Sequence, residues 1–337
     1  MIAPTRIAVL KPCCIGDCVL ALPALDALAT AWPDAALDVY VGDHSRAVFA
    51  GRNNGTSLHR LDEHITLQRV QRLGWRLRRG RYDAIIVLDR SRGLRLAATL
   101  ARPARRASVR GVNPETRHEA QVYLDALKDV GVDAPLTPPR IVPTDAEQAS
   151  AAQFVPAGGA YAVLHPGGAE NPGVSMPEKR WPVERFGVLA SALRVRGLKV
   201  LLSGGPGDIE RCRAVAQSTQ LDASAILAGR LDIMMTAAVV QRAALFVGPD
   251  TGMSHVAAAV GTPSVAIFGP TNPRRYRPLG ALVRVVAAPG AWDVPDADLR
   301  RPRATPPGAR IELVEVAEVL AACDELLRLP GSGATCR

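Results

Sequence analysis

Short apolar runs alternate with longer stretches of helical spacing along the first half of this chain. The first run is Arg6–Leu10 (RIAVL), and a helical stretch follows at residues 18–32. Two more apolar runs, residues 37–41 and 84–88, flank a basic stretch with helical spacing at Leu67–Arg79. Strands that are apolar throughout and separated by helices are typical of a parallel sheet covered on both faces. The first half is therefore predicted to be an α/β unit.

The same alternation starts again after a proline-rich stretch at residues 137–143, which is the best candidate for a linker. Each strand of this second series ends in a turn that contains glycine or proline, where ligands bind in doubly wound sheets. We therefore expect two Rossmann-like domains, 1–150 and 151–337, that face each other across a cleft. The second series has predicted strands at residues 161–165, 199–203, 244–247 and 264–268, a helix at 183–196, and a strand turn followed by an amphipathic helix within 311–327.

Positive charge is concentrated in one part of the chain. The formal net charge is +9, yet residues 69–106 alone hold twelve arginines against Asp83 and Asp89, a balance of +10. Such a region suits an acidic acceptor, an anionic membrane surface or a nucleic acid. Aromatic residues do not alternate with the basic ones as they do in single-strand binders, since Trp75 and Tyr82 stand alone. Nucleic acid is therefore not an expected partner.

The cysteines and the N-terminal segment indicate the compartment. Cys13, Cys14 and Cys18 are too crowded for a disulfide framework and lack the spacing of a metal site, which favours a reducing cytoplasm. Asp17 and Asp26 interrupt the apolar N-terminal region, so no signal peptide is expected. No apolar stretch is long enough to span a bilayer. We expect a cytoplasmic protein without a bound metal or cofactor, with peripheral membrane contact left open.

Residues 248–255 (GPDTGMSH) join a buried strand to a helix. The free N–H groups and the positive dipole end of a helix start can receive a diphosphate. The alternative is that Asp250 or Thr251 simply caps the helix. Residues 165–182 form a long polar loop, which in a compact α/β domain favours function. Lys179 in that loop is one of four lysines, and it serves either an anionic ligand or only the solvated surface.

Residues 11–17 (KPCCIGD) contain a glycine and an acid between the first strand and its helix. Asp17 then either points into a cleft above the sheet or caps the helix. The last predicted strand leads into Arg274, Arg275 and Arg277, which either contact phosphate or, as we favour, are solvated. The chain has neither GxGxxG nor a Walker A motif, which disfavours dinucleotide-dependent dehydrogenases and phosphate-loop NTPases.

Taken together, these segments resemble the ADP-heptose:lipopolysaccharide heptosyltransferase family, glycosyltransferase family nine. The resemblance implies a GT-B fold, an acceptor held mainly by the first domain, a donor held mainly by the second, and inversion at the anomeric carbon. The segments that carry it occur in the family's order: RIAVLKPCCIGDCVLALPAL, RYDAIIVLDRSRG, VLHPGGAENPGVSMPEKRWPVERF, VLLSGGPGD and FVGPDTGMSHVAAAVGTPSVAIFGPTNP.

The resemblance also assigns roles. Asp17 matches the family's proposed general base and Lys179 its donor-phosphate lysine. Asp250 would face the sugar hydroxyls and the Thr251–Met253 amides the diphosphate. Before the Gly-Asp pair the family commonly has Ser or Thr, whereas this chain has Pro12, Cys13 and Cys14, and thiols are poor hydrogen-bond partners. The expected donor-binding residues are His165, Gly167, Gly168, Lys179, Asp250, Thr251, Gly252, Met253 and His255, and the expected acceptor-binding residues are Cys13, Cys14 and Gly16.

The expected activity is therefore inverting, metal-independent transfer of a heptose from an ADP-heptose-type donor to an acceptor hydroxyl. A carboxylate can accept the hydroxyl's proton, and a lysine with helix-start amides can stabilise the departing diphosphate. The expected acceptor is the inner core of lipopolysaccharide, an anionic glycolipid, at the cytoplasmic face of the inner membrane. The alternatives are a small natural product or a protein as acceptor, a nucleotide-sugar 2-epimerase, and a binder of sugar nucleotides without activity.

Overall fold

The computed structural model describes residues 3–50, 56–62, 66–109, 117–171, 173–295 and 304–329. The chain divides into two compact units, Met1–Pro139 and Arg140–Arg337. Each unit contains a five-stranded parallel sheet with helices packed on it. The prediction of two parallel α/β units is therefore confirmed. The division falls ahead of helix α5 (Asp145–Ala151), which belongs to the second unit.

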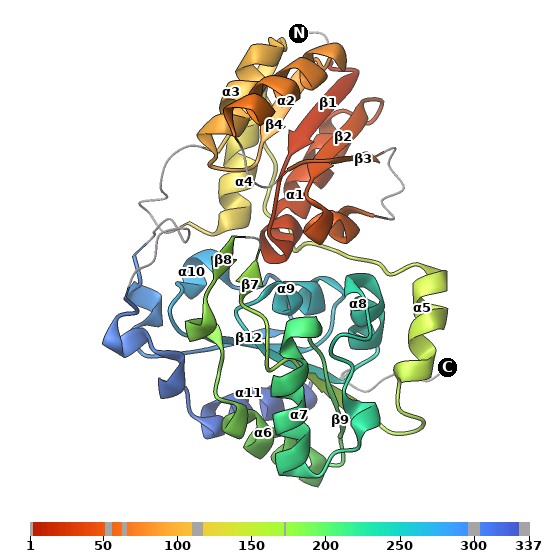
Figure 1. Ribbon diagram of the computed structural model, residues 1–337, viewed down its shortest axis with the longest axis vertical. Coiled ribbons are helices and arrows are strands. Elements are labelled where there is room, and N and C mark those ends of the chain that lie inside the picture. The colour runs from red at the N-terminus through yellow and green to blue at the C-terminus, as the bar shows by residue number, and fades with distance from the viewer. Residues whose placement is uncertain are drawn as a thin grey trace. The chain divides into compact units, whose positions relative to one another are not determined.

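The sheet of the first unit has the strand order β3-β2-β1-β4-β5, with all neighbouring strands parallel. The first apolar run, which was predicted to be a strand, forms the central strand, and its apolar sequence fits a strand that is buried on both faces (Figure 1). The described elements of this unit are β1 (Arg6–Leu10), α1 (Ile15–Ala31), β2 (Ala36–Val41), β3 (Thr56–Arg60), α2 (Leu67–Arg79), β4 (Ala84–Val87), α3 (Arg92–Ala101), β5 (Arg105–Ser108) and α4 (Glu119–Leu127).

Helices α2 and α3 pack closely against each other in the first unit (Figure 1). The contact depends on Gly74, because a Cβ at that position would lie 3.0 Å from the Cβ of Leu100 and 3.2 Å from the Ala97 carbonyl oxygen. Leu73 and Leu77 of α2 join Ala97 of α3 in one buried cluster with the sheet. Both helices therefore bury one face and leave the other to solvent.

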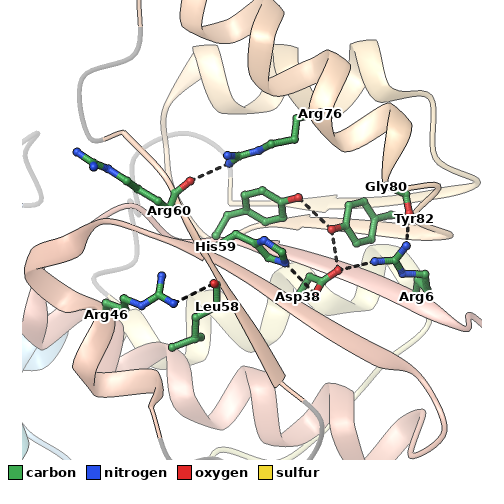
Figure 2. Close-up of polar contacts among 10 residues, drawn as sticks. Arg6, Asp38, Arg46, Leu58, His59, Arg60, Arg76, Gly80 and Tyr82 are labelled. Atoms are coloured by element: carbon green, nitrogen blue, oxygen red, sulfur yellow. Dashed lines mark hydrogen bonds and ion pairs between the residues drawn. The ribbon is translucent and has the colours of Figure 1, made fainter.

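A buried carboxylate joins three segments of the first sheet (Figure 2). Asp38 on β2 accepts hydrogen bonds from the Tyr82 hydroxyl at 2.7 Å and from Arg6 Nη2 at 2.9 Å, and His59 Nε2 lies 2.9 Å from its other oxygen. Burial raises the pKa of Asp38, but the contacts with His59 and Tyr82 lower it by a larger amount, so the net shift is downward. Because Arg6 and Tyr82 lie where β1 and β4 begin, away from the ligand edge of such sheets, we assign this cluster to the scaffold.

The sheet of the second unit has the strand order β12-β11-β10-β6-β9, again with all neighbours parallel. A short hairpin, β7 (Glu170–Asn171) and β8 (Val174–Ser175), lies in the polar loop after β6. The described elements are α5, β6 (Tyr161–Leu164), α6 (Val183–Val195), β9 (Lys199–Leu202), α7 (Ile209–Thr219), α8 (Ile233–Gln241), β10 (Leu245–Pro249), α9 (Gly252–Ala259), β11 (Ser264–Phe268), α10 (Pro273–Tyr276), β12 (Val283–Ala287) and α11 (Val316–Leu327).

The C-terminal segment supports the polar loop of this unit. A short 3-10 turn, Ile311–Leu313, precedes α11, so the expected strand turn there is wrong. The carbonyl oxygen of Val314 accepts a hydrogen bond from Trp181 Nε1 at 2.9 Å and another from the guanidinium of Arg185. Trp181 is fully buried and packs edge-to-face on Phe186. The chain that leaves the polar loop is thereby fixed to the residues just before α11.

Candidate functional site

A buried ion pair forms where β10 ends. Asp250, with 5% of its surface exposed, receives Lys179 from the polar loop, and Nζ lies 2.7 Å from Oδ2. The Thr271 hydroxyl donates to the same oxygen at 2.6 Å, and His255 Nε2 lies 3.9 Å from the other. The family resemblance assigns Lys179, Asp250 and His255 to one donor site, and the structure brings all three side chains together. The role expected for each toward a donor stays a prediction.

The charge of Asp250 is held by its neighbours. Burial alone would raise the pKa of its carboxyl, but the ammonium of Lys179, followed by His255, lowers it, and the net shift is far downward. Asp250 is therefore ionised across the whole physiological range. Because Lys179 already neutralises this carboxylate, an anionic ligand at the site would share the lysine with Asp250.

Helix α9 begins beside this pair with its first amides uncapped. Thr251 occupies the N-cap position in an extended conformation, but its side chain makes no capping hydrogen bond. Its buried hydroxyl has no hydrogen-bond partner among the described residues. The alternative that a side chain of Asp250 or Thr251 caps this helix is therefore wrong. The amides of Gly252 and Met253 lie at the positive end of the helix dipole, where an anion is stabilised.

His165 lies at the end of the neighbouring strand, β6. Its Nδ1 is 3.2 Å from the Ser203 hydroxyl, and its ring stacks on Phe246 with 6.3 Å between centroids. Burial lowers the pKa of His165, so the ring is neutral at physiological pH. A neutral imidazole can donate or accept one hydrogen bond through its remaining nitrogen.

The glycines after His165 let this loop approach the start of α9. Gly168 has a φ of +83°, and a Cβ there would lie 2.6 Å from Thr251 Cγ2. A Cβ at Gly167 would lie 2.1 Å from the carboxyl group of Asp208. That carboxylate accepts the Gly168 amide and the Gly205 amide, each at 2.9 Å. Asp208 therefore ties two glycine-containing loops together at the carboxyl ends of β6 and β9.

The candidate site of the first unit lies at the start of α1. This helix begins at Ile15 with Cys14 at the N-cap position, so Gly16 and Asp17 belong to its first turn. The Gly-Asp pair therefore lies inside the helix and not in a turn ahead of it as expected, and the alternative that Asp17 caps the helix is wrong. Cys13 and Cys14 are half-buried, and their sulfur atoms lie 3.0 Å apart.

Two further side chains surround Asp17. The Tyr123 hydroxyl makes a long contact of 3.5 Å with its Oδ1. Lys11 is buried, with its Nζ 2.6 Å from the Cys13 carbonyl oxygen and 5.5 Å from the centre of the Tyr123 ring. Burial lowers the pKa of Lys11. The negative charge of Asp17 and smaller contributions from other neighbouring groups together raise it by more, so the net shift is upward. A permanent ammonium therefore lies close to the Asp17 carboxylate.

Several residues of these sites were not singled out from the sequence. Thr271 and Asp208 follow glycines at strand ends, in the segments GPT and GGPGD. Those glycine-containing turns were the feature of the sequence from which both residues could have been predicted. Tyr123 lies 106 positions from Asp17 and gave no signal. Arg275 was expected to be solvated, but it is 4% exposed and packs on the Tyr276 ring, because α10 turns it inward. In the described part of the chain, no three His, Cys, Asp or Glu side chains are grouped to hold a metal.

Residues 70–302 match the sequence profile of glycosyltransferase family 9 (heptosyltransferase). The chain belongs to this family. It is 31% identical over 170 residues to lipopolysaccharide heptosyltransferase 3 of Escherichia coli, a match that covers 48% of this chain and 49%, about half, of that relative. It is 27% identical over 293 residues to lipopolysaccharide heptosyltransferase 1 of Pseudomonas aeruginosa, covering 80% and 79% of the two chains.

The solved structures of family 9 members have the same fold. The E. coli ADP-heptose LPS heptosyltransferase II superposes with a TM-score of 0.76 at 22% identity, over 96% of this chain and 98% of that one. The expected GT-B architecture is therefore confirmed. Membership of family 9 favours glycosyl transfer over the 2-epimerase alternative. No helix in the described ranges combines the length and apolar character needed to cross a membrane.

Proposed function

We propose that this protein transfers a heptose from ADP-heptose to a hydroxyl of the lipopolysaccharide inner core, with inversion and without a metal. The observation that carries the proposal is the buried Asp250–Lys179 pair beside the uncapped start of α9. Together they offer one ammonium, free helix-start amides and a carboxylate in one place. That set suits the diphosphate and the hydroxyl groups of a nucleotide sugar.

The donor is assigned to the second unit. The diphosphate would lie on the Gly252 and Met253 amides, with Lys179 shared between it and Asp250. Stabilisation of the leaving diphosphate by preorganised donors lowers the barrier for breaking the sugar–phosphate bond. The neutral ring of His165 and the unpartnered hydroxyl of Thr251 supply further contacts at the same strand ends.

The general base is assigned to Asp17 in the first unit. Its carboxylate would take the proton of the acceptor hydroxyl while that oxygen bonds to the anomeric carbon and the bond to the diphosphate breaks. One displacement of this kind inverts the anomeric centre. The hydroxyl of Tyr123 contacts this carboxylate, and the buried ammonium of Lys11 lies over the same Tyr123 ring. Cys13 and Cys14 would border the acceptor.

The test is a mass-spectrometric assay of ADP-heptose with a heptose-free core glycolipid. Asp17→Asn should lower turnover by about 10²–10⁴ with little change in donor affinity, because only proton acceptance is lost. Asp26→Asn, which removes another carboxylate from α1, is the matched control and should leave turnover within about twofold. Unchanged turnover in Asp17→Asn would remove the general-base assignment.

The acceptor and the donor nucleotide are tested separately. A thermal-shift screen against ADP-, UDP-, GDP- and CDP-sugars should give the largest stabilisation with the ADP-sugar, since a bound ligand stabilises the folded state. Offering a small natural product or a protein in place of the glycolipid tests the other acceptors. Because an inner-core acceptor is embedded in a membrane, the proposal places the enzyme at the cytoplasmic face of the inner membrane.

A further inference from the structure

Four large apolar side chains are exposed on the two neighbouring helices of the first unit. They are Leu67 and Trp75 on α2, 69% and 62% exposed, and Leu96 and Leu100 on α3, 46% and 44% exposed. Single exposed apolar residues are common, but four on two packed helices form a patch that needs an explanation. We call these four residues and the arginines around them the α2–α3 surface.

These side chains are additional to the hydrophobic core. Helix α2 already buries Val70, Leu73 and Leu77 against the sheet, and α3 buries Leu94. Leu100 reaches Gly74 at the contact between the two helices, which places apolar atoms of α3 beside α2. Leu67, Trp75 and Leu96, and the exposed part of Leu100, are therefore available to a partner.

The arginines of this surface differ in their partners: on α2, Arg69 pairs with Asp62 and Arg79 lies over the Trp75 ring. Arg76 is used internally, since it donates to the Arg60 carbonyl oxygen at 2.8 Å and lies over the Tyr40 ring (Figure 2). Arg72, Arg78 and Arg92 are exposed instead, and no carboxylate of the described residues pairs with them. Twelve arginines against two acids in residues 69–106 leave this part of the chain strongly positive.

The other exposed apolar residues of the protein have a different setting. Val188 and Val195 on α6 are 59% and 88% exposed. Two of the three arginines on and next to that helix are paired with acids, Arg185 with Glu315 and Arg196 with Asp324, and Arg194 donates to the Thr219 carbonyl oxygen. On the α2–α3 surface, exposed Trp and Leu side chains stand instead beside Arg72, Arg78 and Arg92, for which the described residues offer no acidic partner.

We propose that the α2–α3 surface docks the protein on an anionic phospholipid bilayer. A helix with exposed arginines beside leucine and tryptophan lies in the lipid interface, where the guanidinium groups meet phosphates and the apolar side chains enter the acyl boundary. A nucleic acid would use the charges but would gain little from exposed leucines. The inference deepens the proposed function, because it names the surface that brings the enzyme to a membrane-embedded acceptor.

The experiment measures co-sedimentation of the full chain with vesicles, without donor or acceptor. Vesicles of equal parts phosphatidylcholine and phosphatidylglycerol should bind the protein, and vesicles of phosphatidylcholine alone should bind it far more weakly. An arginine near an anionic surface changes the affinity by about fivefold, so the triple variant Arg72→Gln/Arg78→Gln/Arg92→Gln should bind about a hundredfold more weakly. High salt should also weaken the binding of the wild-type protein to anionic vesicles, because salt screens the attraction between arginines and phosphates.

The apolar contribution is tested with Leu67→Ser/Trp75→Ser, which should lose about tenfold in affinity or more. Trp75→Phe should still bind, but the blue shift of tryptophan fluorescence on vesicle binding should disappear. The matched control is Arg213→Gln/Val195→Ser in the second unit, which removes one exposed arginine and one exposed apolar side chain and should bind as wild type does. Circular dichroism checks that all variants fold.

Three results would overturn the inference: equal binding to neutral and anionic vesicles, wild-type binding by the triple variant, or tighter binding to a single-stranded oligonucleotide than to the anionic vesicles. The transfer assay with Asp17→Asn is independent of these measurements. Vesicle binding without heptose transfer would therefore count against the proposed function alone, and heptose transfer without vesicle binding against the docking surface alone.

Discussion

Replacing Lys179 by methionine removes the ammonium that neutralises Asp250 and keeps most of the side-chain volume. Asp250 is 5% exposed and Lys179 14%, with 2.7 Å between Nζ and Oδ2, so the variant leaves a charge nearly without solvent. Breaking a buried pair from one side costs about 3–5 kcal/mol. We expect the low end, about 3 kcal/mol, because Lys179 retains some solvent contact and Thr271 still donates to the carboxylate.

The assay is thermal unfolding of the full chain by calorimetry. For a unit the size of Arg140–Arg337, 1 kcal/mol lowers the melting temperature by about 2–4 °C, so Lys179→Met should melt about 6–12 °C lower. The double variant Lys179→Met/Asp250→Asn should recover most of this loss, because asparagine carries no charge and can still accept from Thr271. A single variant within about 2 °C of wild type, or a double variant no better than the single one, would refute the reasoning.

The pH dependence follows from the pKa of Asp250. In the wild type this pKa is lowered on folding, so its stabilisation is complete above the unfolded value of about 3.9 and is lost as the pH falls further. In Lys179→Met the largest contribution that lowers this pKa is lost, so burial is opposed only by His255 and Thr271 and the carboxyl protonates at higher pH than in the wild type. The difference in unfolding free energy between the two proteins should therefore narrow as the pH is lowered toward 4. A constant gap would contradict a charge effect.

Two further variants test the scaffold and the loop at the site. Asp38→Asn should lower the free energy of unfolding by about 1–3 kcal/mol at neutral pH, because it weakens the hydrogen bonds from Arg6 and Tyr82. In urea titrations this loss should shrink below about pH 4, since the pKa of Asp38 is lowered on folding. An equal loss at every pH would show that the charge of Asp38 does not contribute to stability. Gly168→Ala should weaken ADP binding in calorimetric titrations by about tenfold or more, because the new Cβ would press on Thr251 and the residue would keep a φ of +83°. The control is Gly197→Ala, which has the same φ but whose Cβ would lie in open space.

The sequence predicted the central strands well, and the edge strand β9 with them, but it missed the two polar edge strands of the first sheet. β1, β4, β6, β10 and β11 are apolar runs because both faces of a central parallel strand are buried. β3 (TSLHR) and β5 (RRAS) lie at sheet edges, are largely polar, and were not predicted. Each of these two edge strands has one neighbour only, so polar side chains are tolerated there and its composition resembles that of a loop.

The candidate sites were predictable only as separate segments. The turn at 248–255 and the loop at 165–182 showed polar residues at strand ends, but not that Lys179 pairs with Asp250, 71 positions away. That contact depends on how the loop folds back over the strand ends. Asp17 and Tyr123 meet in the same manner through the packing of α1 on α4. Pairings across such separations follow from topology, which local spacing does not encode.

The hydrogen bonds to the Val314 carbonyl oxygen have a practical consequence for anyone who shortens or tags this protein. They connect Trp181, two positions after Lys179, to a residue near the other end of the unit. Trimming the chain back to residue 310 would withdraw an acceptor from a buried indole N–H and release the segment that carries the lysine. The residues just before the C-terminal helix therefore act as a distant brace for the loop that carries Lys179, and tail deletions should be judged by the stability of that loop as well as by solubility.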